Sequence, residues 1–285
     1  MEKLHSDIVE NILHRLPTET ALQAKRVCKT WKIILRSKTD KIGLLFAVKY
    51  PGSHDEYGLY YGDPIGGKIN YTWFALDNMS SGKSIPWYDY LDGMLGSCNG
   101  LVCFQRRSWT SGEPFLICNP ITGEVVYVPN NTQLECFVDY YGRRVTISGF
   151  GYCHSTNEYK IVIMHEKEYR VQVYTVGGRG DWRNTETIRI HPFSDSTGVC
   201  TNGALHWLHL INIGYHCTIA AFDLVNENFK FIPLPRYEYV KHHHSLKLLG
   251  GNNLYLVHTI ITMSNEHCTD IWEYKRKNTS TTNCC

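Results

Sequence analysis

Several histidines stand close together, and their spacing raises the question of metal binding. His206 and His209 are three residues apart in an apolar run typical of a strand. Alternate side chains of a strand point to opposite faces, so these two imidazoles cannot bind the same metal ion. We expect one packed and one surface histidine. The three consecutive histidines at 242–244 precede a predicted strand, and we interpret them as a solvated loop. The sequence therefore predicts no metal site.

Other patterns that would carry catalysis or bind a cofactor are missing from the sequence. The run Gly-Gly-Arg-Gly at 177–180 has the wrong spacing for a phosphate-binding loop, and it lies between two predicted strands, so we expect a hairpin turn. Neither a G-x-S-x-G nucleophile motif nor an H-E-x-x-H zinc motif occurs. We expect no catalytic residues, no cofactor and no enzyme activity.

The first 36 residues instead show helical periodicity. Ile8, Ile12 and Leu16 recur every four residues, and Val9 and Leu13 each follow one of them by a single residue. One face of a first helix is therefore apolar. A module of about 35 residues cannot build a self-sufficient core, so its apolar surface must be covered by something else.

Capping residues and a proline predict where these helices begin and end. Ser6 or Asp7 is expected to cap the first helix, and Pro17 disfavours its continuation. The residues that we expect a second helix to bury are Ala21, Leu22, Ala24, Val27 and Cys28. In the third helix, Trp31, Ile34 and Leu35 lie on one apolar face.

This segment resembles the F-box of the large plant F-box family. The residues that carry the resemblance are Leu4, Asp7, Ile8, Ile12, Leu13, Arg15, Leu16, Pro17, Leu22, Val27, Cys28, Lys29 and Trp31. His5 and Asn11 depart from the family pattern, and both affect the entry to the first helix. The resemblance implies docking on the Skp adaptor of a cullin–RING ubiquitin ligase. From the family motif, the expected adaptor contacts are Leu4, His5, Ile8, Ile12, Leu16, Pro17, Val27, Cys28 and Trp31.

A nucleic-acid-binding regulator is the alternative interpretation of the same helices. Residues 1–42 carry a net charge of +4 within a chain of net charge +2, so the remainder is slightly acidic. A helix-turn-helix would place Lys29, Lys32, Arg36 and Lys38 on phosphates. Against it, the turn between the first two helices lacks the usual glycine, and Trp31 and its apolar neighbours leave little of the third helix free to read bases.

After residue 42 the sequence changes to short apolar runs punctuated by Gly, Pro, Asn and Asp, the pattern of strands and turns. The fold class that we predict is a small N-terminal α-helical module followed by an all-β domain. The expected strands are 44–49, 101–105, 115–118, 125–128, 145–150, 159–164, 170–176, 185–190, 204–208, 218–223, 229–233, 245–249, 254–259 and 270–274.

Two segments of the β domain repeat. Cys98-Asn99-Gly100-Leu101 returns as Thr201-Asn202-Gly203-Ala204, a spacing of 103 residues, and the turn that begins at Asn119 returns at Asp223 after 104. Half of this period is about 50 residues, the length of a kelch-like propeller blade. The repeat therefore predicts a β-propeller rather than a sandwich.

The same region resembles the F-box-associated domain. The matching segments are 96–103, 118–123, 150–152, 158–162, 202–207, 222–224 and 270–272. With the F-box, the resemblance implies a substrate-recognition subunit of a Skp–cullin–F-box ubiquitin ligase, which bridges the adaptor to a protein target. We assign residues 1–42 to the F-box, 43–275 to a propeller-like domain and 276–285 to a disordered tail. At about 50 residues per blade, 233 residues make between four and five blades. A closed ring and an incomplete one are therefore both alternatives.

Propellers bind partners through loops, and aromatic and arginine side chains carry much of the energy of protein interfaces. The stretch 57–61 is one tyrosine-rich candidate between expected strands. The predicted substrate contacts are Trp87, Tyr88, Tyr90, Tyr140, Tyr141, Arg143 and Arg144.

No apolar run approaches the roughly 20 residues of a membrane-spanning helix, and charged residues interrupt the N-terminus where a signal peptide would be apolar. We therefore expect a cytoplasmic or nuclear location, or both, and 11 cysteines that are thiols. Apart from the adaptor with its ligase and a protein substrate, we expect no nucleic-acid or membrane partner.

Overall fold

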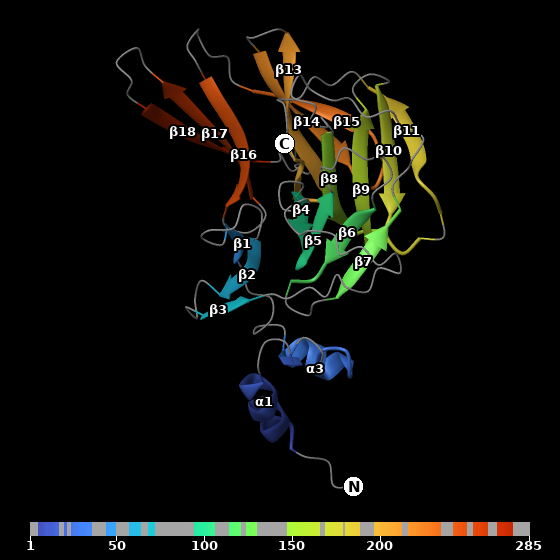
Figure 1. Ribbon diagram of the computed structural model, residues 1–285, viewed down its shortest axis with the longest axis vertical. Coiled ribbons are helices and arrows are strands. Elements are labelled where there is room, and N and C mark those ends of the chain that lie inside the picture. The colour runs from blue at the N-terminus through green and yellow to red at the C-terminus, as the bar shows by residue number, and fades with distance from the viewer. Residues whose placement is uncertain are drawn as a thin grey trace, which may run out of the picture. The chain divides into compact units, whose positions relative to one another are not determined.

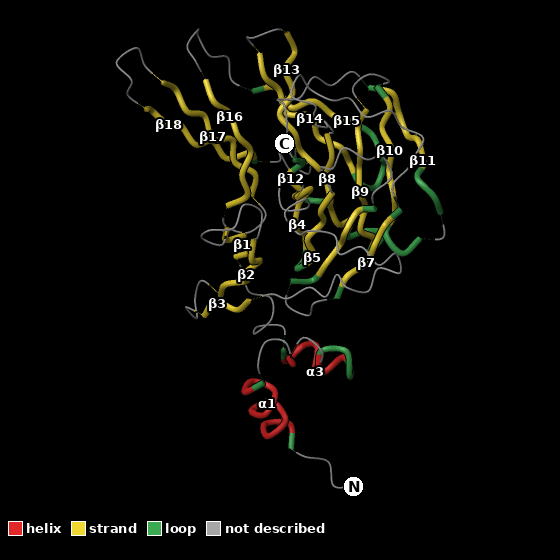
Figure 2. The backbone as a smooth tube through the Cα atoms, viewed as in Figure 1, coloured by secondary structure: helices red, strands yellow, loops and turns green. Residues whose placement is uncertain are grey.

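The computed structural model has helices in the first 35 residues and strands from residue 44 onward, as Figures 1 and 2 show. The structure describes residues 5–16, 20–21, 24–35, 44–49, 57–63, 68–71, 94–105, 114–120, 124–129, 147–165, 169–178, 180–188, 197–212, 216–234, 242–249, 253–261 and 267–275. The predicted fold class, a small helical module before an all-β propeller-like domain, is confirmed.

The first helix, α1, comprises Ser6–Arg15, and α3 comprises Lys29–Ile34. His5 is the N-cap of α1 and makes no side-chain capping bond, so the expectation that Ser6 or Asp7 caps the helix was wrong. The hydroxyl of Ser6 instead donates to Asp7 Oδ1 at 3.2 Å. The described helices contain none long and apolar enough to cross a bilayer.

The strands form five sheets in the described part of the chain. Their bounds are β1 Leu44–Lys49, β2 Tyr57–Asp63, β3 Lys68–Tyr71, β4 Met94–Cys98, β5 Leu101–Gln105, β6 Phe115–Cys118, β7 Val125–Val128, β8 Ile147–Cys153, β9 Glu158–His165, β10 Arg170–Thr175, β11 Arg183–Thr187, β12 Val199–Thr201, β13 Ala204–Asn212, β14 His216–Asp223, β15 Phe229–Pro233, β16 His242–Leu249, β17 Asn253–Ile261 and β18 His267–Tyr274. The sheet orders are β1-β2-β3, β4-β5-β6-β7, β11-β10-β9-β8, β12-β13-β14-β15 and β16-β17-β18.

Each expected strand overlaps an observed one, and four strands were missed. These are β2, β3, β4 and β12. The stretch 57–61 lies in β2, so its interpretation as an inter-strand loop was wrong. The three histidines at 242–244 begin β16, where His244 pairs with His258, and the loop expected there was also wrong. The tyrosines of 57–61 are in fact typical of strands, whereas the histidines at 242–244 are placed in a strand by pairing with β17.

The sequence repeat corresponds to repeated structure. Asn99 and Gly100 have φ values of 49° and 79°, and Asn202 and Gly203 have 51° and 74°. Two successive residues at positive φ make the tight turn that Asn-Gly favours, because it follows the twist of the strands it joins. The second repeated turn is also the same in both copies: the backbone N–H of Asn119 donates to Glu124 O, and that of Asp223 to Asn228 O, both at 2.9 Å.

The chain divides into two compact units. One comprises Met1–Asp92, Gly100–Val102 and Leu116–Tyr127, and the other comprises Gly93–Asn99, Cys103–Phe115 and Val128–Cys285. In the second unit, the first strands β4, β8 and β12 of three successive sheets contact one another. The β8–β11 sheet and the β12–β15 sheet share a core around Val162, Leu205, Trp207 and Phe222, as expected for neighbouring propeller blades.

Glycines allow the close approach of these strands. A Cβ on Gly149 would lie 2.8 Å from Cζ2 of Trp207, and a Cβ on Gly198 would lie 2.6 Å from the same ring. The indole occupies the space that both glycines leave, and its Nε1 donates to Ser148 O at 3.1 Å. Trp207 therefore fixes β13 against β8.

Candidate functional site

The helical segment has a small core of its own. Leu13, Ala21, Ala24 and Leu35 are buried in it, and Val9, Leu16, Trp31 and Ile34 pack around them. The expected shared face of Trp31, Ile34 and Leu35 is therefore confirmed. α1 contacts α3 through this cluster.

Large aliphatic side chains of the same segment remain exposed. Ile8 and Ile12 are 50% and 51% exposed, and four residues apart on α1 they lie on one face of the helix. Val27 and Ile33 are 64% and 72% exposed. Exposed large apolar side chains on a small helical module are typical of a site that binds another protein. We call three of them, Ile8 and Ile12 on α1 and Val27 in the turn before α3, the apolar helical face.

The nine predicted adaptor contacts fall into three groups. His5, Ile8, Ile12, Val27 and Cys28 are exposed. Leu16 and Trp31 pack against the core of the segment, whereas Leu4 and Pro17 lie outside the described residues.

The expectation that the second helix buries Val27 and Cys28 was wrong. Both follow the last helical residue, Ala24, and Cys28 is the N-cap of α3, where its sulfur accepts a hydrogen bond from Trp31 N at 3.5 Å. The helical periodicity that predicted burial therefore ends before these two residues.

The seven predicted substrate contacts, Trp87, Tyr88, Tyr90, Tyr140, Tyr141, Arg143 and Arg144, lie outside the described residues. They stay predictions. The predicted domain limits at 42 and 275 also border residues that are not described, as does the tail 276–285.

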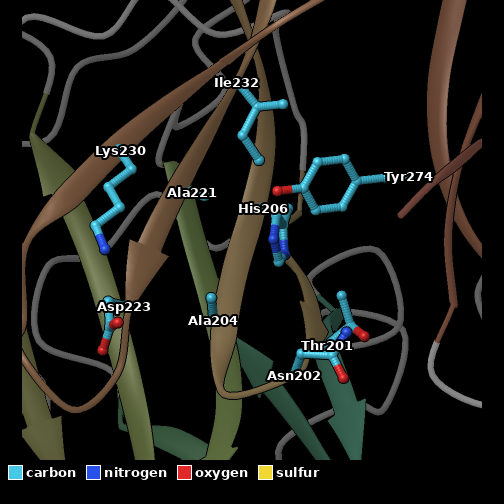
Figure 3. A pocket seen from close by; sticks show the side chains of 9 residues that line it. All are labelled: Thr201, Asn202, Ala204, His206, Ala221, Asp223, Lys230, Ile232 and Tyr274. Atoms are coloured by element: carbon cyan, nitrogen blue, oxygen red, sulfur yellow. The ribbon is translucent and has the colours of Figure 1, made fainter. Parts of the chain in front are cut away.

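A pocket of about 110 Å³ lies between the β12–β15 sheet and β18. Figure 3 shows its nine lining residues, which are Thr201, Asn202, Ala204, His206, Ala221, Asp223, Lys230, Ile232 and Tyr274. The side of the pocket nearest Asp223 carries Lys230, and the opposite side carries the hydroxyl of Tyr274 beside the ring of His206 (Figure 3). The pocket thus combines an apolar wall with both signs of charge.

Asp223 supplies the negative charge of the pocket. Burial opposes its ionisation, but backbone N–H groups of Asn226 and Val225 donate to Oδ1 at 3.0 and 2.8 Å, and Lys230 adds a positive charge. Together these interactions hold the pKa of Asp223 below its usual value, so the carboxylate is ionised at neutral pH.

His206 and His209 are both buried, so the expectation of one surface histidine was wrong. The Nδ1 of His206 lies 3.2 Å from Val199 O, and the ring of His209 lies 5.5 Å from that of Phe231. Both faces of β13 are covered, which a single strand pattern does not reveal. The described residues hold no group of three side chains placed to bind a metal ion.

The pocket was not predicted from the sequence. Asn202 and Asp223 stood out as repeat residues and His206 as a candidate ligand, but Tyr274 joins them only through the placement of β18. The signal that was present, polar residues at the two turns of the repeat, indicated shared turns rather than a shared cavity.

Comparison with protein families identifies both parts of the chain. A model of the F-box domain matches residues 1–42, and a model of the F-box-associated β-propeller domain matches residues 78–263. The chain belongs to the family of F-box proteins with an F-box-associated β-propeller domain. The resemblance noted from the sequence is confirmed.

Curated plant sequences that resemble this chain agree with this family. An F-box/LRR-repeat protein of Arabidopsis thaliana is 25% identical over 80% of this chain and 55% of its own length. Two F-box proteins of the same plant are 23% and 25% identical, over 82% and 86% of this chain and 61% and 60% of their own lengths. The chain therefore spans somewhat more than half of the length of these relatives.

Solved structures resemble this chain only weakly. TolB from Acinetobacter baumannii has a TM-score of 0.39 with 11% identity, over 78% of this chain and 49% of its own. RS223-β-xylosidase has a TM-score of 0.38 with 11% identity, over 84% and 90% of the two chains. These values are too low to carry any conclusion about fold or activity.

Proposed function

We propose that this F-box protein is the substrate-recognition subunit of a Skp–cullin–F-box ubiquitin ligase and is not itself a catalyst. The F-box would dock on the Skp adaptor, and the β domain would hold a protein target. Its contribution to the reaction is proximity, because a tethered target presents its lysines to ubiquitin carried by another subunit at high effective concentration.

The observation that carries the proposal is the apolar helical face. Ile8, Ile12 and Val27 are exposed on a segment that matches the F-box domain and whose own core is formed by only a few residues. Exposing these side chains to water is unfavourable, and because each is already partly buried, covering the rest against an adaptor would contribute about 1–2 kcal/mol per side chain. This is the contribution expected of the centre of a protein interface.

The experiment combines Ile8→Asp and Ile12→Asp in the full-length chain and measures binding to the Skp adaptor. We expect at least a hundredfold weaker binding, because two buried aliphatic contacts are replaced by charges. Since both positions are exposed, the variant should unfold at the same temperature as the parent chain. Undiminished affinity of the folded variant contradicts the proposal.

Val225→Asp is the matched control. Val225 is an aliphatic residue, 48% exposed, in the β domain, and the same substitution there should leave adaptor binding unchanged. Salt-dependent binding of the chain to duplex DNA, lost when Lys29 and Lys32 are replaced by alanine, would instead support the nucleic-acid-binding alternative.

For the substrate, the β domain offers the pocket beside Asp223 and the seven predicted aromatic and arginine contacts. The pocket has room for one side chain of a partner, and its Asp223, Lys230 and Tyr274 provide both acceptors and donors. Proteins that accumulate when the ligase is inhibited, and that bind the parent chain more strongly than a Lys230→Ala, Tyr274→Ala variant, would be substrates held by this pocket.

A further inference from the structure

The first strands of three successive sheets each carry a cysteine near their C-terminal end. Cys98 is the last residue of β4, Cys153 the last of β8, and Cys200 the middle residue of β12. All three are thiols. The Sγ atoms of Cys98 and Cys200 are 4.0 Å apart, although 102 residues separate them in the sequence.

Glycine makes the approach of Cys200 possible. A Cβ on Gly151 would lie 2.7 Å from the Sγ of Cys200, so the absence of a side chain at this position of β8 leaves the space that the sulfur occupies. A Cβ on Gly96 of β4 would lie 3.4 Å from the backbone oxygen of Phe150 on β8, so these two strands also pack closely. The two cysteines are therefore held together by the packing of three backbones rather than by flexible side chains.

The environment makes the two thiols chemically different. Hydrogen bonding with the thiol of Cys200 holds the pKa of Cys98 below its usual value. The same hydrogen bond, together with burial, raises the pKa of Cys200. A shared proton of this kind favours one thiolate beside one thiol, the arrangement in which the first sulfur attacks an oxidant and the second resolves the product.

Cys98 and Cys200 are only partly buried, so we expect a small oxidant to reach the pair. Cys118 provides the contrast: it is fully buried, and burial raises its pKa to about 12. Thiolate character and exposure decide which cysteines are oxidised.

We propose that Cys98 and Cys200 are a redox-active pair that forms a reversible disulfide on reaction with hydrogen peroxide. The sulfur of Cys98 attacks one peroxide oxygen, the O–O bond breaks, and the leaving hydroxide takes up the thiol proton as water. Cys98 is then a sulfenic acid. The sulfur of Cys200 attacks the sulfur of Cys98, the S–S bond forms, the S–O bond breaks, and the second hydroxide leaves as water with the proton of Cys200. Two thiols are oxidised, and one peroxide is reduced to two waters.

The disulfide would join β4 to β12 and so link two sheets of the β domain. Forming it requires the sulfurs to move about 2 Å closer, to the S–S bond length of about 2.05 Å. Because the bond closes a loop of roughly 100 residues, it removes much conformational freedom from the unfolded chain. The oxidised protein should therefore unfold at a higher temperature than the reduced protein.

The test treats the reduced full-length chain with hydrogen peroxide, blocks the remaining thiols by alkylation and maps the peptides. We expect a peptide in which Cys98 and Cys200 are linked, a loss of two of the 11 thiols, and recovery of both with a dithiol reductant. The unfolding temperature should rise by about 5 °C or more on oxidation. Cys98→Ser and Cys200→Ser should each abolish the linked peptide and the rise.

Cys268→Ser is the control variant, because Cys268 is an exposed thiol on β18, and both effects should persist in it. The proposal is overturned if the parent chain yields no linked peptide, if Cys200 is linked to Cys153 instead, or if Cys98 is recovered as a sulfinic acid. It is equally overturned if the disulfide forms without raising the unfolding temperature. The parent chain alone can give these results, so the test stands even if a variant does not fold.

Discussion

The helical segment and the two sheets formed by β8–β15 differ in how completely they bury their apolar side chains. In the sheets, apolar residues such as Val162, Leu205 and Phe222 share one extensive buried cluster. In the helical segment, Leu13 is buried, whereas Ile8 and Ile12 on the same helix are half-exposed. The segment is too small to bury all the apolar surface it carries. Apolar residues beyond what a local core uses indicate surface that is reserved for a partner.

The difference also predicts how far the effect of a destabilising core substitution extends. A large side chain in the β cluster supports many neighbours in two sheets, so its loss should affect the whole domain. A residue in the helical core supports only a few others, so its loss should be confined to the helices. The three predictions below test this contrast, from the largest expected effect to the smallest.

Trp207→Ala should destabilise the β domain by about 4 kcal/mol, because it removes a buried aromatic and leaves a cavity. It also leaves the carbonyl of Ser148 without the indole N–H that it accepts from, at 3.1 Å. Chemical denaturation followed by fluorescence of the remaining tryptophans measures the loss. Phe231→Ala is the matched control, because Phe231 is an aromatic residue of the same sheet that is 48% exposed, and it should cost less than about 1 kcal/mol. Equal losses in the two variants would contradict the assignment of Trp207 to the core.

Leu13→Ala should lower the free energy of unfolding of the helical segment by about 3 kcal/mol, and a module of this size is not stable enough to stay folded after such a loss. Hydrogen exchange should therefore show lost protection of the amides in α1 and α3, while β9 and β13 keep theirs. Ile12→Ala, at the exposed neighbouring position, should leave protection in the helices almost unchanged. Lost protection in the β strands of the Leu13 variant would show that the two regions are not energetically separate.

Glu227→Gln should cost about 2 kcal/mol at neutral pH, because it removes the charge from an ion pair with the buried Lys160. The carboxylate accepts from Lys160 Nζ at 2.9 Å and from the guanidinium of Arg183. Partial burial opposes its ionisation, but the hydrogen bonds from Arg183 and Lys160 and their charges hold the pKa of Glu227 below its usual value.

A carboxyl group whose pKa is lowered on folding stabilises the protein above its unfolded pKa, about 4.3 for glutamate, and loses this contribution as the pH falls through the folded pKa. The unfolding temperature of the parent chain should therefore fall below about pH 4.3 more steeply than that of Glu227→Gln. Glu273→Gln is the control, since Glu273 pairs with the exposed Lys275, and its acid profile should follow that of the parent. Parallel profiles for the parent and Glu227→Gln would contradict the role given to this ion pair.

Much of the architecture was predictable because its signals are local. The Asn-Gly pairs at 99–100 and 202–203 set the backbone of two turns irrespective of what surrounds them, and their spacing revealed the repeated blades. The helical period from Val9 to Leu16 likewise depends only on neighbours along the chain. Local patterns failed at β2 and at the start of β16, where pairing with another strand decides the conformation.

The candidate sites were less predictable than the fold. The exposed positions of Ile8 and Ile12 agree with a docking role inferred from the F-box pattern, but periodicity alone would have buried them. The pocket depends on Tyr274 meeting the β12–β15 sheet from another strand.

The sequence by itself determined the helical module, the all-β domain, the Asn-Gly turns and the family, because each depends on residues near one another in the chain. Only the tertiary structure decided which apolar side chains stay exposed, that Lys160 is buried against Glu227, and that Cys98 meets Cys200. In the repeat, the residue equivalent to Cys98 is Thr201, so no alignment of the two copies pairs these cysteines. Burial and long-range proximity depend on which backbone surfaces pack together, and the glycines of β8 exert their effect only once β12 and β13 lie against them.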